Sequence, residues 1–325
     1  MIVIFSYPDE ESTNKVIEWL NYYNCNFKRI HLKNEDFRNI EVHLTDKAKN
    51  IFLKLSDGTT LNFNDVSCFF CRGMEFVNFK VENDTNLPDN VITKYLNYEF
   101  LALVNYFYST VNKKSIGWIN NDCLNKLTQL EIANEVGLST SEILVTNTQE
   151  AVAKYFGKKN VITKAIQENI AINLEEEIFI QRVQKVTIGS LNEKFFPSLF
   201  QREIVKNYEI RTFYLDKECF SIAIISSSKK TDCIDMREHY RTNYFEPYRL
   251  PKKIENKIVN LMEKLNLNSV SIDLIKGVDG KYYFLEVNPV GQYDWVSVYG
   301  GYDLDQKIAF YLNKLEKRTN ETKSK

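Results

Sequence analysis

Two neighbouring segments near the carboxyl end of the chain alternate apolar and polar side chains and are separated by a strong turn signal. The segments cover residues 271–275 and 281–289, and both are rich in β-branched and aromatic residues. Asp279 and Gly280 lie between them, and an Asp-Gly pair is typical of a two-residue β-hairpin turn. The pattern therefore predicts an antiparallel hairpin, which fixes which side chains face each other.

In that hairpin Asp273 lies opposite Glu286, and Asn288 emerges on the same face because strand side chains alternate with a period of two. Two carboxylates directly across a ladder repel each other unless a cation lies between them. Oxygen ligands of this kind suit Mg²⁺ together with phosphate oxygens and water. The alternative is an edge hairpin with solvated carboxylates. We also expect Phe284 and Ile275 on the carboxylate face, so both faces are partly apolar, and this burial favours the metal site.

Length and composition exclude several classes of protein. A chain of 325 residues can hold two or three domains with a substantial core. A net charge of −1 argues against a nucleic-acid-binding protein that relies on a broad basic surface. The apolar stretch 91–111 is interrupted by charged and amide residues, so we expect a core helix and no association with a membrane.

Cysteine usage points to a reducing compartment. Only Cys68 and Cys71 have a spacing that resembles a metal or redox motif, and they lie in an apolar run without a second pair nearby. We therefore expect a buried strand with inert thiols. Because the sequence also shows no signal peptide at its start, a cytoplasmic location is predicted.

The first part of the chain is predicted to form a small α/β domain over residues 1–117. Residues 2–6 and 66–71 have the pattern of buried strands, and residues 12–23 have that of a helix between them. Arg72 directly follows the second strand, where an open α/β sheet places its ligand crevice. A surface arginine that closes the strand is an equally open interpretation.

Two lysines could hold phosphate groups. Lys126 begins a helical pattern that stops at Gly137, and Lys164 interrupts the apolar strand 161–166. Each could be a surface lysine by itself, but together they could place two point charges on phosphates. No Walker A motif occurs and the chain has only 11 glycines, so phosphate would be held by side chains and metal rather than by a glycine-rich loop.

Further charged pairs lie between residues 201 and 237. Glu209 and Arg211 alternate with Ile210 and should share a strand face, where a salt bridge is the plainer interpretation. Asp235 and Arg237 form a second pair of this kind. Arginine suits such a site because its planar guanidinium binds carboxylates and phosphates with two hydrogen bonds.

The order of these signals resembles the ATP-grasp superfamily, and within it the graspetide synthetases, which include the microviridin-type and "grasp-with-spasm" peptide ligases. The resemblance rests on a lysine helix, a strand lysine, and five motifs: Gln-x-x-Ile at 201–204, Glu-x-Arg at 209–211, Asp-x-Arg at 235–237, Ser-x-Asp at 271–273 and Phe-Leu-Glu-x-Asn-Pro-x-Gly-Gln at 284–292. It covers residues 118–312 well and the N-terminal domain more loosely.

The resemblance implies an α/β (α+β) ATP-grasp fold with an N-terminal α/β pre-ATP-grasp domain. The expected parts are the N-terminal domain 1–117, a central subdomain 118–189, a carboxyl-terminal subdomain 190–312 and a flexible tail 313–325. Many ATP-grasp enzymes have a glycine-rich loop after the strand lysine, whereas residues 167–174 contain no glycine. Peptide-modifying members are also poor in glycine there, so this departure favours them over small-molecule ligases.

The resemblance also implies roles for individual residues. The expected ligands of Mg²⁺ are Asp273, Glu286 and Asn288. The expected contacts of ATP are Lys126 and Lys164 on the phosphates and Gln201, Glu203 and Ile204 around the adenine. The expected catalytic and substrate residues are Arg211, Glu209 and Arg237, with Asp235 and Arg72 as further substrate contacts.

The implied function is that of an ATP-dependent, ADP-forming ligase that activates Asp or Glu side chains of a ribosomal precursor peptide as acyl phosphates. Thr, Ser or Lys side chains would then close ω-ester or ω-amide macrocycles. Residues 179–186 match the leader-peptide-binding region in position, and a homodimer is left open. Two alternatives stand beside this interpretation: a carboxylate–amine ligase acting on free amino acids or a protein terminus, and a non-catalytic nucleotide-binding regulatory protein.

Overall fold

The computed structural model describes residues 1–32, 39–72, 91–117, 125–166, 171–174, 177–180, 183–226, 243–289 and 291–323. The chain divides into two compact units. Unit 1 contains Met1–Asn121 together with Asp303–Lys325, and unit 2 contains Asp122–Tyr302.

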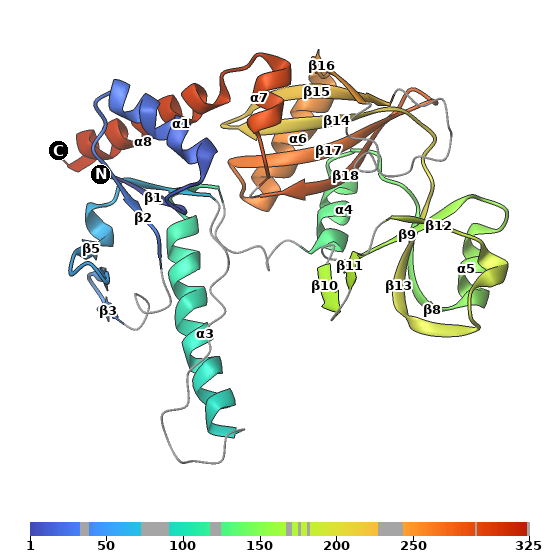
Figure 1. Ribbon diagram of the computed structural model, residues 1–325, viewed down its shortest axis with the longest axis horizontal. Helices are drawn as coiled ribbons and strands as arrows, with labels where there is room; N and C mark the ends of the chain where they lie inside the picture. The colour runs from blue at the N-terminus through green and yellow to red at the C-terminus, as the bar shows by residue number, and fades with distance from the viewer. Residues whose placement is uncertain are drawn as a thin grey trace. The chain divides into compact units, whose positions relative to one another are not determined.

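Unit 1 is built on a parallel sheet whose strand order is β2-β1-β6-β7 (Figure 1). Its strands are β1 (Ile2–Phe5), β2 (Phe27–Ile30), β6 (Cys68–Cys71) and β7 (Ser115–Ile116). Its helices are α1 (Glu11–Tyr22), α3 (Val91–Asn112) and α8 (Leu304–Lys323). A smaller antiparallel sheet contains β3 (Ile40–Leu44), β4 (Lys49–Lys54) and β5 (Thr60–Asn62), followed by the 3-10 helix η1 (Phe63–Asp65).

Helices cover both faces of the parallel sheet, which explains why β1 and β6 consist almost entirely of apolar residues. Val3 and Phe5 of β1 pack with Phe107 of α3 in one core, whereas α1 and α8 lie on the opposite face (Figure 1). Cys68 and Cys71 are buried and not joined in a disulfide. Burial raises the pKa of the Cys68 thiol to about 12, so it stays protonated near neutral pH.

Helix α8 differs from the expected flexible tail at 313–325. It continues without interruption through Lys323 and belongs to unit 1. Asn313 and Glu316 are buried on it, and the Glu316 carboxylate lies 3.6 Å from the ammonium group of Met1. The polar composition that suggested fraying belongs to a helix with one buried face and one solvated face.

Unit 2 contains two larger sheets and a hairpin of β10 (Ala171–Leu174) with β11 (Glu177–Ile180). The first sheet has the order β12-β9-β13-β8, formed by β8 (Ile143–Thr148), β9 (Val161–Lys164), β12 (Gln184–Val186) and β13 (Lys194–Arg202). Helix α5 (Gln149–Phe156) packs on it, and the 3-10 helix η3 (Ile188–Ser190) precedes β13. The expected boundary between residues 189 and 190 therefore falls within one sheet, since β12 and β13 both pair with β9.

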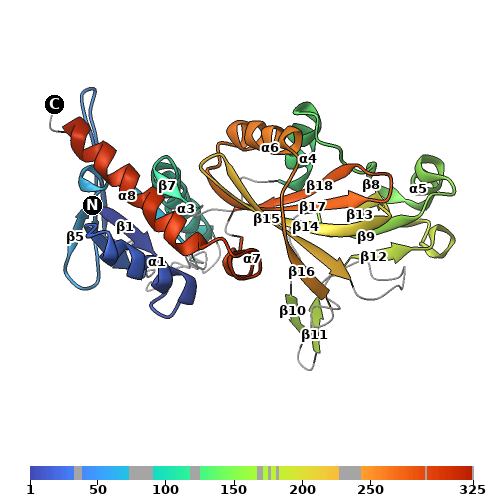
Figure 2. The ribbon, with the colours of Figure 1, turned by 90° about the horizontal axis from the view of Figure 1, so that it is seen from above.

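The second sheet of unit 2 has the order β16-β15-β14-β17-β18 (Figure 2). Its strands are β14 (Lys206–Leu215), β15 (Glu218–Ser226), β16 (Asn243–Tyr248), β17 (Ser269–Gly277) and β18 (Tyr282–Asn288). The accompanying helices are α4 (Lys126–Glu135), α6 (Lys252–Leu265) and α7 (Asp294–Gly300). Helices α4 and α6 lie side by side and are joined by an ion pair between Glu135 and Lys264 at 2.7 Å.

The β17–β18 hairpin pairs Asp273 with Glu286, as expected, but its turn differs from the expected two-residue turn. Gly277 donates its N–H to the carbonyl of Lys281, so the loop contains three residues and Gly280 takes a left-handed φ of 80°. This moves the register by one residue near the turn. A bulge between Asp273 and Leu274 restores the register before the carboxylates.

The bulge corrects one face assignment. Phe284 pairs with Leu274 instead of Ile275, and so lies on the face opposite the carboxylates. Phe284 and Leu274 are both fully buried there. Phe284 therefore belongs to the core. Tyr283 lies opposite Ile275, which is the position that the sequence had predicted for Phe284.

None of the helices within the described ranges is long and apolar enough to span a membrane. Helix α3 is a core helix over its second half only. Val104, Phe107 and Val111 are buried, whereas Tyr95 and Tyr98 nearer its start are exposed. This difference between the two halves gives a test of where the core of unit 1 lies.

We predict that Phe107→Ala lowers the stability of unit 1 by about 3–5 kcal/mol, because it leaves a cavity between α3 and the sheet. Tyr98→Ala on the exposed half of the same helix should change stability by less than about 0.5 kcal/mol. Hydrogen exchange of the β1 amides measures both variants. Similar protection in both would contradict the assignment of the core.

Candidate functional site

The paired carboxylates of Asp273 and Glu286 each face a cation from a different element. Arg211 on β14 is the cross-strand neighbour of Asp273, and its Nη1 donates to both oxygens of that carboxylate, at 2.8 and 2.7 Å. The guanidinium also lies 5.8 Å from the ring of Trp295 on α7. Its Nε is buried and has no hydrogen-bond partner among the described residues. Arg211 is thus a cation oriented by Asp273 whose Nε–H has no protein partner in the part of the chain that the structure describes.

Lys126 provides the cation beside the second carboxylate. Its Nζ lies 2.8 Å from Oε2 of Glu286, and the lysine side chain is only 12% exposed. Lys126 is the first residue of α4, and Asn125 caps this helix by accepting a 2.8 Å hydrogen bond from the N–H of Leu127. The cap fixes where α4 begins and therefore where Lys126 emerges.

Lys164 lies in the electrostatic field of the same group. It is the last residue of β9, and its pKa falls from 10.5 to about 8. Burial is the main cause and the charge of Lys126 adds to it, while Glu286 and Asp273 act in the opposite direction. Helix α4 with Lys126, β14 with Arg211 and β9 with Lys164 therefore each bring a cation towards one pair of carboxylates.

Asn288, the third expected metal ligand, pairs with Ser271 two residues beyond Glu286 and is exposed. The chain turns directly after it, and the N–H of Gly291 donates to the Asn288 carbonyl at 3.1 Å. A Cβ at Gly291 would overlap the Ser271 side chain and approach the Asn288 carbonyl to 2.9 Å. Only glycine fits this turn without displacing Asn288.

The donor set fits Mg²⁺. No three residues of the types His, Cys, Asp and Glu are grouped as metal ligands within the described ranges, and the candidate set here is two carboxylates and one amide oxygen. Mg²⁺ is commonly held by one or two carboxylates and completes its shell with phosphate oxygens and water. Lys126 and Arg211 compensate the two carboxylates in the structure, which is the charge balance that a bound cation would otherwise supply.

Gln201 has the features expected of a ligand contact. It lies two residues from Leu199, the direct partner of Lys164, so Gln201 and Lys164 share one face of the first sheet. Gln201 is 1% exposed, and its Oε1 has no hydrogen-bond partner in the part of the chain that the structure describes. A buried acceptor of this kind suits a donor such as the amino group of adenine.

Glu203 and Ile204 form the connection between the two sheets of unit 2. The N–H of Glu203 donates to the Asn160 carbonyl at 2.9 Å, and its carboxylate lies 3.3 Å from Nζ of Lys185. Ile204 is partly buried between β13 and β14. Both residues are therefore placed beside Gln201 by the strand that precedes them.

Glu209 shares the strand face of Arg211, and its carboxylate forms an ion pair with Lys206. The structure therefore gives Glu209 a partner other than Arg211, while Arg211 bonds Asp273. Asp235 and Arg237 lie outside the described residues.

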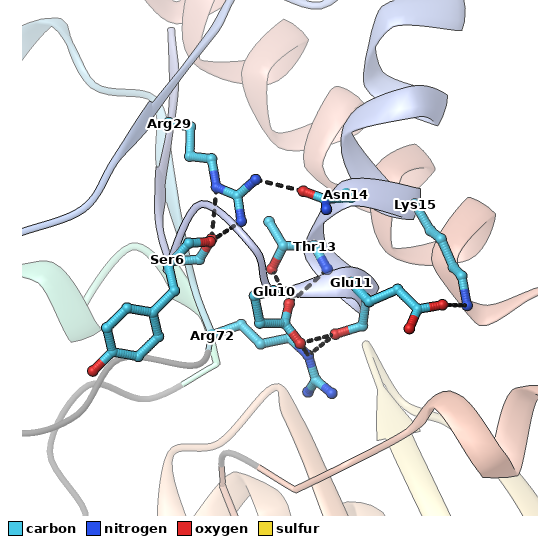
Figure 3. Close-up of polar contacts among 10 residues, drawn as sticks. Ser6, Glu10, Glu11, Thr13, Asn14, Lys15, Arg29 and Arg72 are labelled. Carbon is cyan, nitrogen blue, oxygen red and sulfur yellow. Dashed lines mark hydrogen bonds and ion pairs between the residues drawn. The ribbon is translucent and has the colours of Figure 1, made fainter.

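Arg72 is buried at the end of β6 in unit 1 (Figure 3). Its Nε lies 3.5 Å from Oε1 of Glu10 and donates to Oγ of Ser12. Glu10 also caps α1 by accepting from the N–H of Thr13 at 2.6 Å. Burial raises the pKa of Glu10, but the hydrogen bonds from Ser12 and Thr13 and the charge of Arg72 outweigh it, so the pKa is lowered.

A second arginine joins this network from the neighbouring strand. Nε of Arg29 donates to Oγ of Ser6 at 2.9 Å, and its Nη1 donates to Oδ1 of Asn14 at 2.5 Å (Figure 3). The carboxyl ends of β1, β2 and β6 are thereby joined to the first turn of α1. Glu10 was not expected from the sequence, because glutamate is not among the residues that are preferred at the N-cap of a helix.

Comparison with known proteins gives matches at the level of structure. No family model matches the sequence, and its comparison with the curated proteins yields no match. The macrocyclase MdnC of Microcystis aeruginosa, bound with its precursor peptide MdnA, is similar with 26% identity, coverage of 96% of this chain and 99% of that chain, and a TM-score of 0.72.

Two further structures are similar over nearly the whole chain. An ATP-grasp ligase of Chryseobacterium gregarium that is associated with ribosomally made peptides, in complex with ADP and a leader and core peptide, has 21% identity, 96% coverage of both chains and a TM-score of 0.77. The ATP-grasp ligase PsnB, complexed with a minimal precursor, Mg and ADP, has 17% identity, covers 97% of this chain and 98% of that chain, and gives a TM-score of 0.70.

We predict that Lys164→Met makes the nucleotide-free protein more stable at pH 7 by on the order of 2 kcal/mol, because it removes a charge that burial and Lys126 disfavour. Below about pH 8 the lysine is charged in both folded and unfolded chains, so the full penalty applies. Between about pH 8 and 10.5 only the unfolded chain keeps the proton, so the penalty and the advantage of the variant should disappear.

Thermal unfolding at pH 7 and at the upper end of this range measures the effect. Lys158→Met, an exposed lysine on the neighbouring turn, is the control and should show no gain. A Lys164→Met protein less stable than the parent at pH 7 would contradict the buried-charge assignment.

Proposed function

We propose that this protein, an ATP-grasp ligase with the fold of the graspetide synthetases, joins side chains within a ribosomally made precursor peptide to form macrocycles. The observation that carries the proposal is the meeting of Lys126, Lys164 and Arg211 around one facing pair of carboxylates. Such a group can balance a nucleotide triphosphate, a metal ion and a reacting carboxylate at the same place. The likeness to ligases solved with ADP and peptides supports this use of the site.

The proposed reaction has two steps. A carboxylate oxygen of an Asp or Glu side chain of the peptide attacks the γ-phosphorus of ATP, and ADP leaves, which gives an acyl phosphate. The hydroxyl of Thr or Ser, or the amine of Lys, then attacks the acyl carbon, loses its proton, and phosphate leaves with its bonding electron pair. The products are an ester or an amide, ADP and phosphate, and no nucleophile from the protein is required.

The residues divide into those that bind the nucleotide, those that would bind the metal, and those that act on the acyl group or contact the substrate. Lys126 and Lys164 bind the phosphates, and Gln201 with the backbone at Glu203 and Ile204 holds the adenine. Asp273, Glu286 and Asn288 would hold Mg²⁺, which supplies positive charge to the transferring phosphoryl group when bound. Arg211 stabilises negative charge on the acyl group through the donor that Asp273 leaves available. Glu209, Asp235 and Arg237 are the further catalytic and substrate residues proposed in unit 2, and Arg72 is a proposed substrate contact of unit 1.

Two parts of the chain favour a peptide substrate over a free amino acid, and neither carries a proposed catalytic residue. They are unit 1 and the β10–β11 hairpin. The similarity to MdnC covers unit 1 as well as unit 2. The β10–β11 hairpin forms its own two-stranded sheet, and an extended peptide can add a strand to such an edge. We therefore propose that the leader segment docks at residues 179–186, of which 181 and 182 lie outside the described residues.

The alternatives make different demands on the site. A carboxylate–amine ligase for free amino acids or a protein terminus would turn over ATP without a precursor peptide. A regulatory nucleotide-binding protein would be free to lose the metal ligands and the two lysines, whereas this chain keeps all five, which are Asp273, Glu286, Asn288, Lys126 and Lys164. The four cysteines within the described ranges are free thiols, which agrees with the proposed cytoplasmic location.

The proposal is tested by intact mass spectrometry of a short peptide that is rich in Thr, Ser or Lys and in Asp or Glu, and is encoded beside the gene. The peptide is incubated with the protein, ATP and Mg²⁺. Loss of whole water masses that depends on ATP supports macrocyclisation. ADP release with free amino acids and an unchanged peptide mass would favour the second ligase, and nucleotide binding without ADP release would favour the regulatory protein.

We predict that Glu286→Gln lowers ATP turnover by about 100-fold or more, because an amide holds a divalent cation less well than a carboxylate. Asp279→Asn makes the same chemical change in the exposed turn of the same hairpin and should leave turnover unchanged. Release of ADP is the measurement, and far-UV circular dichroism checks folding. Equal turnover in the two variants would remove Glu286 from the metal site.

We predict that Arg211→Ala slows peptide dehydration by about tenfold or more, while the dissociation constant of Mg-ADP changes less than about threefold, because the guanidinium acts on the acyl group. The control is Lys217→Ala. Lys217 lies on the turn after β14, where it forms an exposed ion pair with Glu263. Calorimetry and mass spectrometry give the two quantities. If the dehydration rate and the affinity for Mg-ADP fell together, Arg211 would be a phosphate contact.

A further inference from the structure

Strand β18 carries Glu286 and Asn288 and is the last strand of its sheet. An edge strand presents backbone N–H and C=O groups that need partners on its outer side, and burying such groups without partners is costly. Part of this need is met by the segment after α4, since the N–H of Phe284 donates to the carbonyl of Ser139 at 2.8 Å.

A glutamine side chain takes the place of a neighbouring strand at that point. Oε1 of Gln129 accepts from the N–H of Val287 at 2.8 Å, and Nε2 donates to the Val287 carbonyl at 3.4 Å. Gln129 is 4% exposed, and Val287 is also buried. One amide therefore bonds both backbone groups of the residue between the two proposed metal ligands.

The same helix face carries Lys126. Residues three apart in a helix project on one side, so the turn of α4 that brings Gln129 to Val287 also brings Lys126 to Glu286. The two contacts lie one residue apart on β18: Nζ of Lys126 lies 2.8 Å from Oε2 of Glu286, next to the Gln129–Val287 bonds. Because Lys126 has four rotatable side-chain bonds, the helix position alone leaves its ammonium group free to move.

We propose that Gln129 is the positioning residue that fixes Lys126 and the Glu286–Asn288 segment relative to each other, so that phosphate and metal meet at one place. This inference rests on the proposed function of the site. Gln129 does not touch the reacting atoms itself. It sets the distance between a helix that binds phosphate and a strand that binds the metal, and it does so through backbone atoms, whatever side chain stands at position 287.

A purely structural role would give a different result. A buried glutamine that only satisfies an edge strand would contribute to stability and leave ligand affinity unchanged. The chain offers a matched case on α5, where Nε2 of Gln149 donates to the backbone carbonyl of Ile188 at 2.8 Å. Gln149 is the first residue of α5, the helix that packs on the first sheet through Val152 and Phe156.

The test compares Gln129→Leu with Gln149→Leu in the full chain. Calorimetry gives the dissociation constant of Mg-ADP, hydrogen exchange reports the Val287 amide, and thermal unfolding reports stability. We expect Gln129→Leu to speed exchange at Val287 and to raise the dissociation constant at least tenfold. Gln149→Leu should lower stability with less than a twofold change in affinity.

Gln129→Glu provides a second variant because it keeps the acceptor for the Val287 N–H and lacks the donor. If Gln129→Leu does not fold, Gln129→Glu should still fold and bind Mg-ADP more weakly than the parent. If both variants fold, Gln129→Glu should bind Mg-ADP more tightly than Gln129→Leu. Faster exchange at Val287 in either variant with affinity within twofold of the parent would overturn the inference. A parent protein that binds no Mg-ADP would overturn the proposed function instead, so the two failures are distinguishable.

Discussion

Two carboxylates that face each other across the β17–β18 ladder set the main electrostatic constraint on unit 2. Asp273 and Glu286 would repel each other in a half-buried site. Each carboxylate forms an ion pair with its own cation, Asp273 with Arg211 and Glu286 with Lys126. The cations come from different elements, one from the adjacent strand and one from a helix start. Keeping them in place requires the sheet, α4 and the link between the two sheets to be correctly arranged.

A third cation, Lys164, has no carboxylate contact among the residues that the structure describes. Lys164 reaches the site from the other sheet of unit 2, and burial together with Lys126 makes its charged form unfavourable, as its lowered pKa shows. Such an arrangement is expected where a polyanion binds, because the ligand supplies the missing negative charge. In the proposed function, a phosphate-rich ligand would supply this charge, and the stability that the free protein loses there would become affinity for that ligand.

Precise placement depends on local devices at the edge of the sheet. The bulge in β18 brings Glu286 opposite Asp273 and turns Phe284 into the core, although the turn has one more residue than a two-residue hairpin. Gln129 then secures Val287 from the side, and Gly291 allows the chain to pass Ser271 closely after Asn288. In unit 1, Glu10 plays a comparable part by joining the start of α1 to Arg72.

The sequence by itself determined the hairpin, the pairing of Asp273 with Glu286, the helix that begins at Lys126 and the buried strands of unit 1, because these depend on local periodicity, caps and turn residues. Tertiary structure decided the rest. The bulge, the side of Phe284, the incorporation of residues 313–323 into α8, and the contacts of Arg211, Gln129 and Glu10 all join residues far apart in the chain or depend on what packs against them. Local sequence patterns do not indicate which distant residues will come into contact, so only the folded chain specifies these contacts.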